Sequence, residues 1–278
     1  MNRREIEDLW RETLRSARPT PEQFDRLANG IVSVYASGDP RSARHIQNRL
    51  KQIAERTGQT FDTGGIDLVT AQTLIADEVG YGSWDDLVES VRNQTETRRP
   101  ILFQYAIAAM ERGDFSALET MVGGRAQFTL QIIEWFEKGY FDDELETLAE
   151  VFSASCMLGY PDAAAYLLDK EVDPLAGIKT GLNGFHYAAS SGQLNVIRLL
   201  IERKVPMEVR NMYGGTVFEQ ALWSAINEYT PDHAAIIEAL IEGGAEIDPG
   251  TLEWWQQQDV PSVDTKKRVA KALKNAQE

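Results

Sequence analysis

The chain has 278 residues, of which 43% are hydrophobic, a formal net charge of −15 and a single cysteine. This length and composition allow two ordinary domains with hydrophobic cores, so we expect a folded, soluble protein. A single cysteine excludes an internal disulfide and a thiol-based metal centre. The start MNRREIEDLW lacks an apolar leader and no apolar run is long enough to span a bilayer, so we expect a cytoplasmic location.

The negative charge is concentrated in the second half of the chain. Residues 101–263 contain 9 Lys/Arg against 25 Asp/Glu, whereas the final stretch DTKKRVAKALKNAQE is basic. Such a surface repels phosphate groups and anionic lipids, so we expect neither nucleic acid nor a membrane as a partner. Two explanations of the charge stay open: it keeps the protein soluble, or it complements a basic protein partner.

The first hundred residues predict a bundle of about five short helices. Apolar residues recur at spacings of three and four, as in EIEDLWRETLRSA, and Gly58 ends one of the patterns. Proline at the first helical position supports two of the predicted starts. Four residues have the place and chemistry of helix N-caps: Thr20, Asp39, Asp67 and Ser83.

A polar segment ending in proline, NQTETRRP at residues 93–100, is the predicted linker. We therefore place an N-terminal helical bundle at residues 1–98 and a second domain at residues 99–278.

The second domain contains an internal repeat with an offset of 33 residues. GLNGFH at 181–186 aligns with GGTVFE at 214–219, and Gly192 aligns with Gly159. The last unit is stretched between its helices by seven residues around 227–231. The predicted units lie near 101–125, 145–177, 178–210 and 211–248, followed by a capping helix pair at 249–278.

These repeats resemble the ankyrin family, whose pattern G-x-T-P-L-H-x-A-A-x-x-G is written GLNGFHYAASSG at 181–192. Asn183-Gly184 replaces the Thr-Pro of the family, and Glu219 replaces its histidine one repeat later. The resemblance implies an all-α fold: an N-terminal helical bundle, then an α-solenoid of about four divergent ankyrin repeats, then the capping helix pair.

A second resemblance concerns the N-terminal part. AQTLIADEVGYGSWDDLVESV is similar to a stretch that precedes the repeats in many bacterial ankyrin-repeat proteins. It implies a bacterial origin and the same family, but it names no activity.

His186 has two interpretations, a catalytic or metal-binding residue and a structural one. In the ankyrin pattern this histidine begins the first helix and hydrogen-bonds neighbouring turns, which suits a side chain with both a donor and an acceptor. We predict the structural role because no nucleophile or orienting carboxylate accompanies it in the sequence. His45 in a surface helix and His233 in a polar loop add no metal site, and Cys156 is predicted to be core. We therefore expect no catalytic residue, no metal and no cofactor.

The resemblance further implies that partners contact the turn tips and the exposed positions of each first helix. An apolar strip through Met157, Tyr213 and Trp223, rimmed by acidic residues, is our hypothesis for the binding face. The alternative is that the loop at 227–231 buries Trp223 as core. The predicted protein-binding residues are Lys179, Thr180, Leu182, Ser190, Ser191, Met212, Tyr213, Trp223, Ser224 and Met157, with Glu146, Thr147 and Leu158 as further positions.

Two classes of function stay open at this point. The leading one is a non-catalytic scaffold that binds a protein partner, for which a basic surface is one option. The alternative is an enzyme or small-molecule receptor with a pocket between the bundle and the repeats, lined by Tyr81, Trp84, Trp135 or Phe136. Homo-oligomerisation is a further open possibility.

Overall fold

A computed structural model describes residues 1–16, 18–62, 64–93, 100–115, 118, 125–177 and 181–277. Within these residues the chain forms fifteen α-helices and no strand, so the predicted all-α fold is confirmed. None of the helices in the described ranges is long and apolar enough to cross a membrane. The described residues form two compact units, which divide between residues 112 and 113.

The first unit is a helical bundle whose helices begin at the predicted caps. The side chains of Asp39, Asp67 and Ser83 each accept a hydrogen bond from a backbone N–H in the first turn of the helix that follows. Thr20 and Gln23 form the predicted capping box. The helices are α1 (Arg3–Arg15), α2 (Pro21–Ala36), α3 (Pro40–Thr57), α4 (Leu68–Glu78), α5 (Trp84–Arg92) and α6 (Ile101–Glu111).

Helix α6 belongs to this unit, where it packs on α1 and α4. The predicted linker falls on residues 94–99, outside the described residues, and the predicted domain and repeat boundaries stay predictions. The bundle core is apolar, with fully buried side chains such as Phe24, Leu27 and Phe103.

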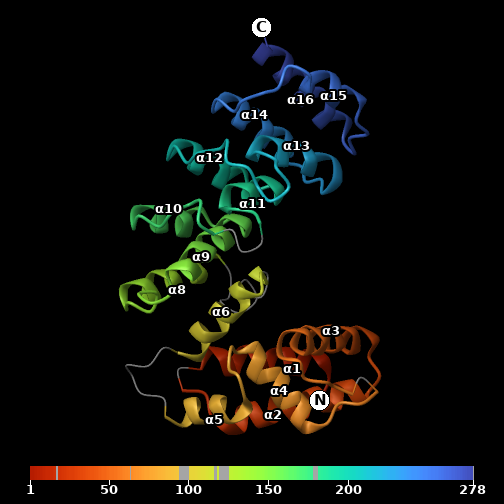
Figure 1. Ribbon diagram of the computed structural model, residues 1–278, viewed down its shortest axis with the longest axis vertical. Coiled ribbons are helices and arrows are strands. Elements are labelled where there is room, and N and C mark those ends of the chain that lie inside the picture. The colour runs from red at the N-terminus through yellow and green to blue at the C-terminus, as the bar shows by residue number, and fades with distance from the viewer. Residues whose placement is uncertain are drawn as a thin grey trace. The chain divides into compact units, whose positions relative to one another are not determined.

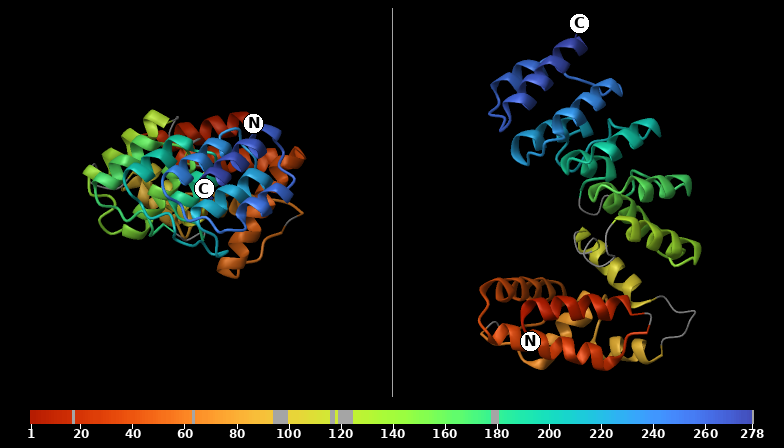
Figure 2. Two further views of the ribbon diagram at one scale, coloured as in Figure 1. Left: turned by 90° about the horizontal axis from the view of Figure 1, so that it is seen from above. Right: turned by 180° about the vertical axis from the view of Figure 1, so that it is seen from behind.

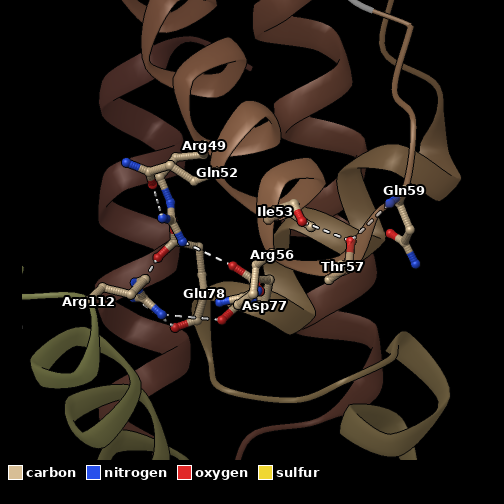
Figure 3. Close-up of polar contacts among 9 residues, drawn as sticks. All are labelled: Arg49, Gln52, Ile53, Arg56, Thr57, Gln59, Asp77, Glu78 and Arg112. Atoms are coloured by element: carbon tan, nitrogen blue, oxygen red, sulfur yellow. Dashed lines mark hydrogen bonds and ion pairs between the residues drawn. The ribbon is translucent and has the colours of Figure 1, made fainter.

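An ion-pair network joins α3, α4 and the residue after α6 (Figure 3). Arg49 pairs with both Asp77, at 3.0 Å, and Glu78, while Arg56 also reaches Asp77. Arg112 donates to Glu78 Oε2 at 2.9 Å and to the backbone carbonyl oxygens of residues 77 and 78, each at 3.3 Å. Apart from the exposed Arg56, these side chains are no more than 18% exposed, so the network fastens the end of the unit.

The second unit is built from two rows of stacked helices (Figure 1). One row contains α9, α11 and α13, and the other contains α8, α10, α12, α14 and α16; the view from behind shows the same two rows (Figure 2). The helices are α8 (Arg125–Glu137), α9 (Leu145–Met157), α10 (Pro161–Asp169), α11 (Gly184–Ser190), α12 (Leu194–Glu202), α13 (Val217–Asn227), α14 (His233–Glu242), α15 (Thr251–Gln257) and α16 (Val263–Gln277).

The stacking is close because small residues occupy the interface between helices. Ala154, Ala188 and Ala221 are buried at similar places in the three first helices. Gly159 and Gly192 end two of these helices with φ near +75°, a conformation that glycine adopts without a steric penalty. The α15–α16 pair confirms the predicted helix pair at the C-terminal end.

Candidate functional site

His186 occupies the turn between two repeats and is buried. Asn183 is the N-cap of α11: its Oδ1 accepts the backbone N–H of Phe185 and of His186, each at 3.1 Å, and lies 2.8 Å from His186 Nδ1. His186 Nε2 lies 3.2 Å from the carbonyl oxygen of Gly215 in the next repeat. Burial lowers the pKa of His186. These contacts support the predicted structural role, in which the side chain holds neighbouring turns together.

The prediction that His233 lies in a polar loop is wrong, because His233 is buried and begins α14. Its Nδ1 accepts the N–H of Thr230 at 2.9 Å, which leaves Nε2–H to donate to the carbonyl oxygen of Ser190 at 3.3 Å. One repeat earlier, Gln193 Nε2 donates to the carbonyl oxygen of Met157 at 3.1 Å. The two acceptors, Met157 and Ser190, are 33 residues apart, so His233 replaces Gln193 after the seven-residue insertion.

Glu219 stands at the repeat position of His186 but serves its own helix. It forms a capping box with Thr216, in which Glu219 Oε2 accepts the N–H of Thr216 at 2.8 Å. Arg210 lies 3.6 Å from the same carboxylate. The side chain is exposed, so it replaces the inter-repeat contact of the histidine with a local one.

The turn at 211–215 presents two apolar side chains to solvent. Asn211 Oδ1 accepts the N–H of Tyr213 at 2.9 Å and of Gly215 at 3.1 Å, and Met212 N–H donates to the carbonyl oxygen of Gly181 at 3.0 Å. Gly181 has a φ of +82°, and a Cβ there would overlap Met212. The backbone of the turn is therefore held in place, while Met212 is 65% and Tyr213 is 79% exposed.

Trp223 on α13 is 49% exposed, so the alternative in which the loop at 227–231 buries it is wrong. That loop is engaged elsewhere. Thr230 packs against Gly192 of the preceding repeat, and hydrogen bonds with Ser262 and Thr265 lower the pKa of Tyr229. Because the inserted residues contact the neighbouring inter-helix loops, they leave the indole of Trp223 open to solvent.

The other predicted binding residues have different surroundings. Ser224 is fully buried and accepts a hydrogen bond from Gln220 at 3.2 Å, so its prediction as a surface residue is wrong. Thr147 is buried as well, because α9 begins before it and packs along its length. Lys179 and Thr180 lie outside the described residues. Glu146 is exposed, and the half-buried positions are Met157, Leu158, Leu182, Ser190 and Ser191.

Other chemistry finds little support among the described residues. They contain no group of three or more His, Cys, Asp or Glu side chains placed to hold a metal ion. Burial raises the pKa of the Cys156 thiol, which makes it a core residue as predicted. Of the aromatic residues proposed to line a pocket, Tyr81 and Trp84 belong to the first unit and Trp135 and Phe136 to the second, where Trp135 is buried.

Residues 151–250 match the family described as "Ankyrin repeats (3 copies)". The matched segment covers α10 to α14 and most of α9, which are the stacked helices described above. No curated protein matches the chain. Ankyrin repeats are therefore present in the second unit, and such repeats generally mediate protein–protein interaction.

Proposed function

We propose that this protein is a non-catalytic scaffold that binds a protein partner through Met212, Tyr213 and Trp223, which we call the apolar triad. The observation that carries the proposal is the exposure of these three side chains on a backbone that is held by hydrogen bonds. Aromatic residues and methionine are enriched in the centres of protein interfaces, where truncation typically costs more than 1 kcal/mol each.

The triad has the local order that a binding surface needs. Asn211 and Gly181 fix the turn that presents Met212 and Tyr213, so little backbone entropy is lost when a partner binds. Trp223 lies on a helix and keeps its indole exposed because the inserted loop packs away from it. The half-buried positions Met157, Leu182, Ser190 and Ser191 supply the remainder of the proposed face.

We further propose that the partner has a basic surface. The repeats are strongly acidic, and opposite charge accelerates association and selects among partners. An interaction of this kind weakens as the salt concentration rises.

The test is affinity capture from a lysate of the organism that encodes the protein. Wild type is compared with the triple variant Met212→Ala/Tyr213→Ala/Trp223→Ala, whose fold is checked by circular dichroism. The matched control is Leu68→Ala/Val69→Ala, which removes exposed apolar side chains of the first unit at the start of α4. We expect a protein that wild type and the control capture and the triple variant does not. Equal capture by all three would overturn the proposal.

A further inference from the structure

The C-terminal helix pair contains two adjacent tryptophans with opposite environments. Trp255 is fully buried, and its Nε1–H donates to the carbonyl oxygen of Lys266 at 3.0 Å, which joins α15 to α16. Trp254 is 43% exposed. A terminal repeat normally presents a polar surface to solvent, because nothing stacks on it. The role of a cap explains Trp255, but it does not explain Trp254.

The position of Trp254 in its helix is the one that faces partners in the other repeats. The N-caps of α11, α13 and α15 are Asn183, Thr216 and Gly250, at spacings of 33 and 34 residues. Trp223 lies seven residues after its N-cap and Trp254 four residues after its own, so one helical turn separates their places. The residues that share the place of Trp254 are Tyr187, Gln220 and Trp254.

The segment around these tryptophans carries only one sign of permanent charge. Between Arg210 and Lys266 the chain has no Lys or Arg. The segment's acidic residues are Glu219, Glu228, Asp232, Glu238, Glu242, Glu246, Asp248, Glu253, Asp259 and Asp264.

Cations from outside the segment neutralise three of these acids. Arg210 pairs with Glu219, and Arg268 pairs with Glu238 at 2.5 Å and Asp264 at 3.9 Å. The other seven form no ion pair with a described residue; they are Glu228, Asp232, Glu242, Glu246, Asp248, Glu253 and Asp259. Exposed indoles among unpaired carboxylates are complementary to a group that is both flat and positively charged.

We propose that α15 extends the binding face beyond the apolar triad, with Trp254 as an anchor for an arginine-rich segment of the partner. This inference rests on the proposed function and specifies its partner. The guanidinium group stacks on an indole and at the same time donates paired hydrogen bonds to a carboxylate such as Glu253 or Asp259. The ammonium group of lysine is a compact charge that stacks less well, so arginine is the residue that this surface selects.

The experiment measures binding of a short fluorescein-labelled peptide that alternates arginine and leucine, by fluorescence anisotropy with the full-length protein. We expect Trp254→Ala to weaken binding about tenfold. The matched control is Val263→Ala, which removes another exposed apolar side chain from the same helix pair and is expected to leave the affinity unchanged. A second variant, Glu253→Gln/Asp259→Asn, removes two exposed charges and is expected to lower the affinity without a change in fold.

A peptide with lysine in place of arginine separates stacking from charge attraction. It should bind wild type more weakly than the arginine peptide and should lose less affinity on Trp254→Ala. Equal affinity of both peptides, or unchanged binding of the arginine peptide by Trp254→Ala, overturns the inference.

The outcome is separable from that of the proposed function. If Trp223→Ala weakens peptide binding and Trp254→Ala does not, the face ends at α13, and the inference fails while the apolar triad stands. If neither variant weakens binding, charge alone attracts the peptide and the arginine-rich partner is wrong. The apolar triad is then judged by the capture experiment, which does not use the peptide.

Discussion

The two units of this protein hold their helices together with different polar contacts. In the bundle, Arg49 and Arg112 pair with carboxylates on α4. In the repeats, His186, Gln193 and His233 contact backbone carbonyl oxygens of a neighbouring repeat. A carbonyl oxygen is present at every position, so the repeat contact survives a change of donor, as from Gln193 to His233. The bundle contact depends on two particular acidic residues, Asp77 and Glu78.

The largest difference between the units should follow removal of charge from the bundle. Glu78→Gln leaves Arg49 and Arg112 with one carboxylate fewer in a site that is mostly buried. We expect a loss of about 2 to 3 kcal/mol of stability, since breaking a buried pair leaves an uncompensated charge. Hydrogen exchange measured by mass spectrometry should increase in α3 and α4 and stay unchanged in α11 to α14.

The matched control for this variant is Glu55→Gln, because Glu55 forms an exposed ion pair with Lys51 at 3.8 Å on α3. Exposed pairs of this kind contribute less than about 1 kcal/mol. Similar exchange in the two variants would show that the network does not stabilise the bundle.

A smaller effect is expected where a neutral contact is removed from the repeats. His186→Ala removes a buried ring and leaves the Gly215 carbonyl oxygen without this donor, which should cost about 2 kcal/mol. Exchange should increase in residues 181–216. Glu219→Ala, at the same repeat position, removes an exposed cap and should cost about 1 kcal/mol or less. A greater loss in Glu219→Ala than in His186→Ala would contradict the comparison.

The smallest effect should come from pH and should again be confined to the repeats. Burial lowers the pKa of both His186 and His233 from the ordinary value of 6.5. Above that value both residues are neutral in either state, and stability is complete. As the pH falls below it, the unfolded chain binds protons that the folded chain does not, so stability decreases.

Thermal unfolding at about pH 7.5 and about pH 5.5, with local exchange as the readout, measures this loss. His233→Gln replaces the titrating ring by the donor that the preceding repeat uses at Gln193, and it should reduce the pH dependence of α13 and α14. An unchanged pH dependence in this variant would exclude His233 as a source of the effect.

The helices and their caps could be predicted from sequence because each depends on residues three or four positions apart. Thr20 with Gln23, Asp39 with Ser42 and Asp67 with Thr70 are contacts of this range. The 33-residue period was also readable, since glycines such as Gly159 and Gly192 recur where the backbone needs a positive φ. The exposure of Trp223 was predicted correctly as one of two alternatives.

The remaining features depend on residues that are distant in sequence. His233 contacts the carbonyl oxygen of Ser190, 43 residues away, and Arg112 contacts Glu78, 34 residues away. A polar side chain can be buried once a distant partner satisfies it, and no local pattern identifies that partner.

By itself, the sequence determined the helical elements, their ends, the repeat period and the acidic character of the second unit, because these are properties of short segments and of composition. Only the tertiary structure decided which side chains of a helix meet solvent. It buried Ser224 and exposed its neighbour Trp223, and it buried Trp255 and exposed Trp254. In each pair the residues are adjacent in sequence, and the stacking of neighbouring helices selects the one that is left for a partner.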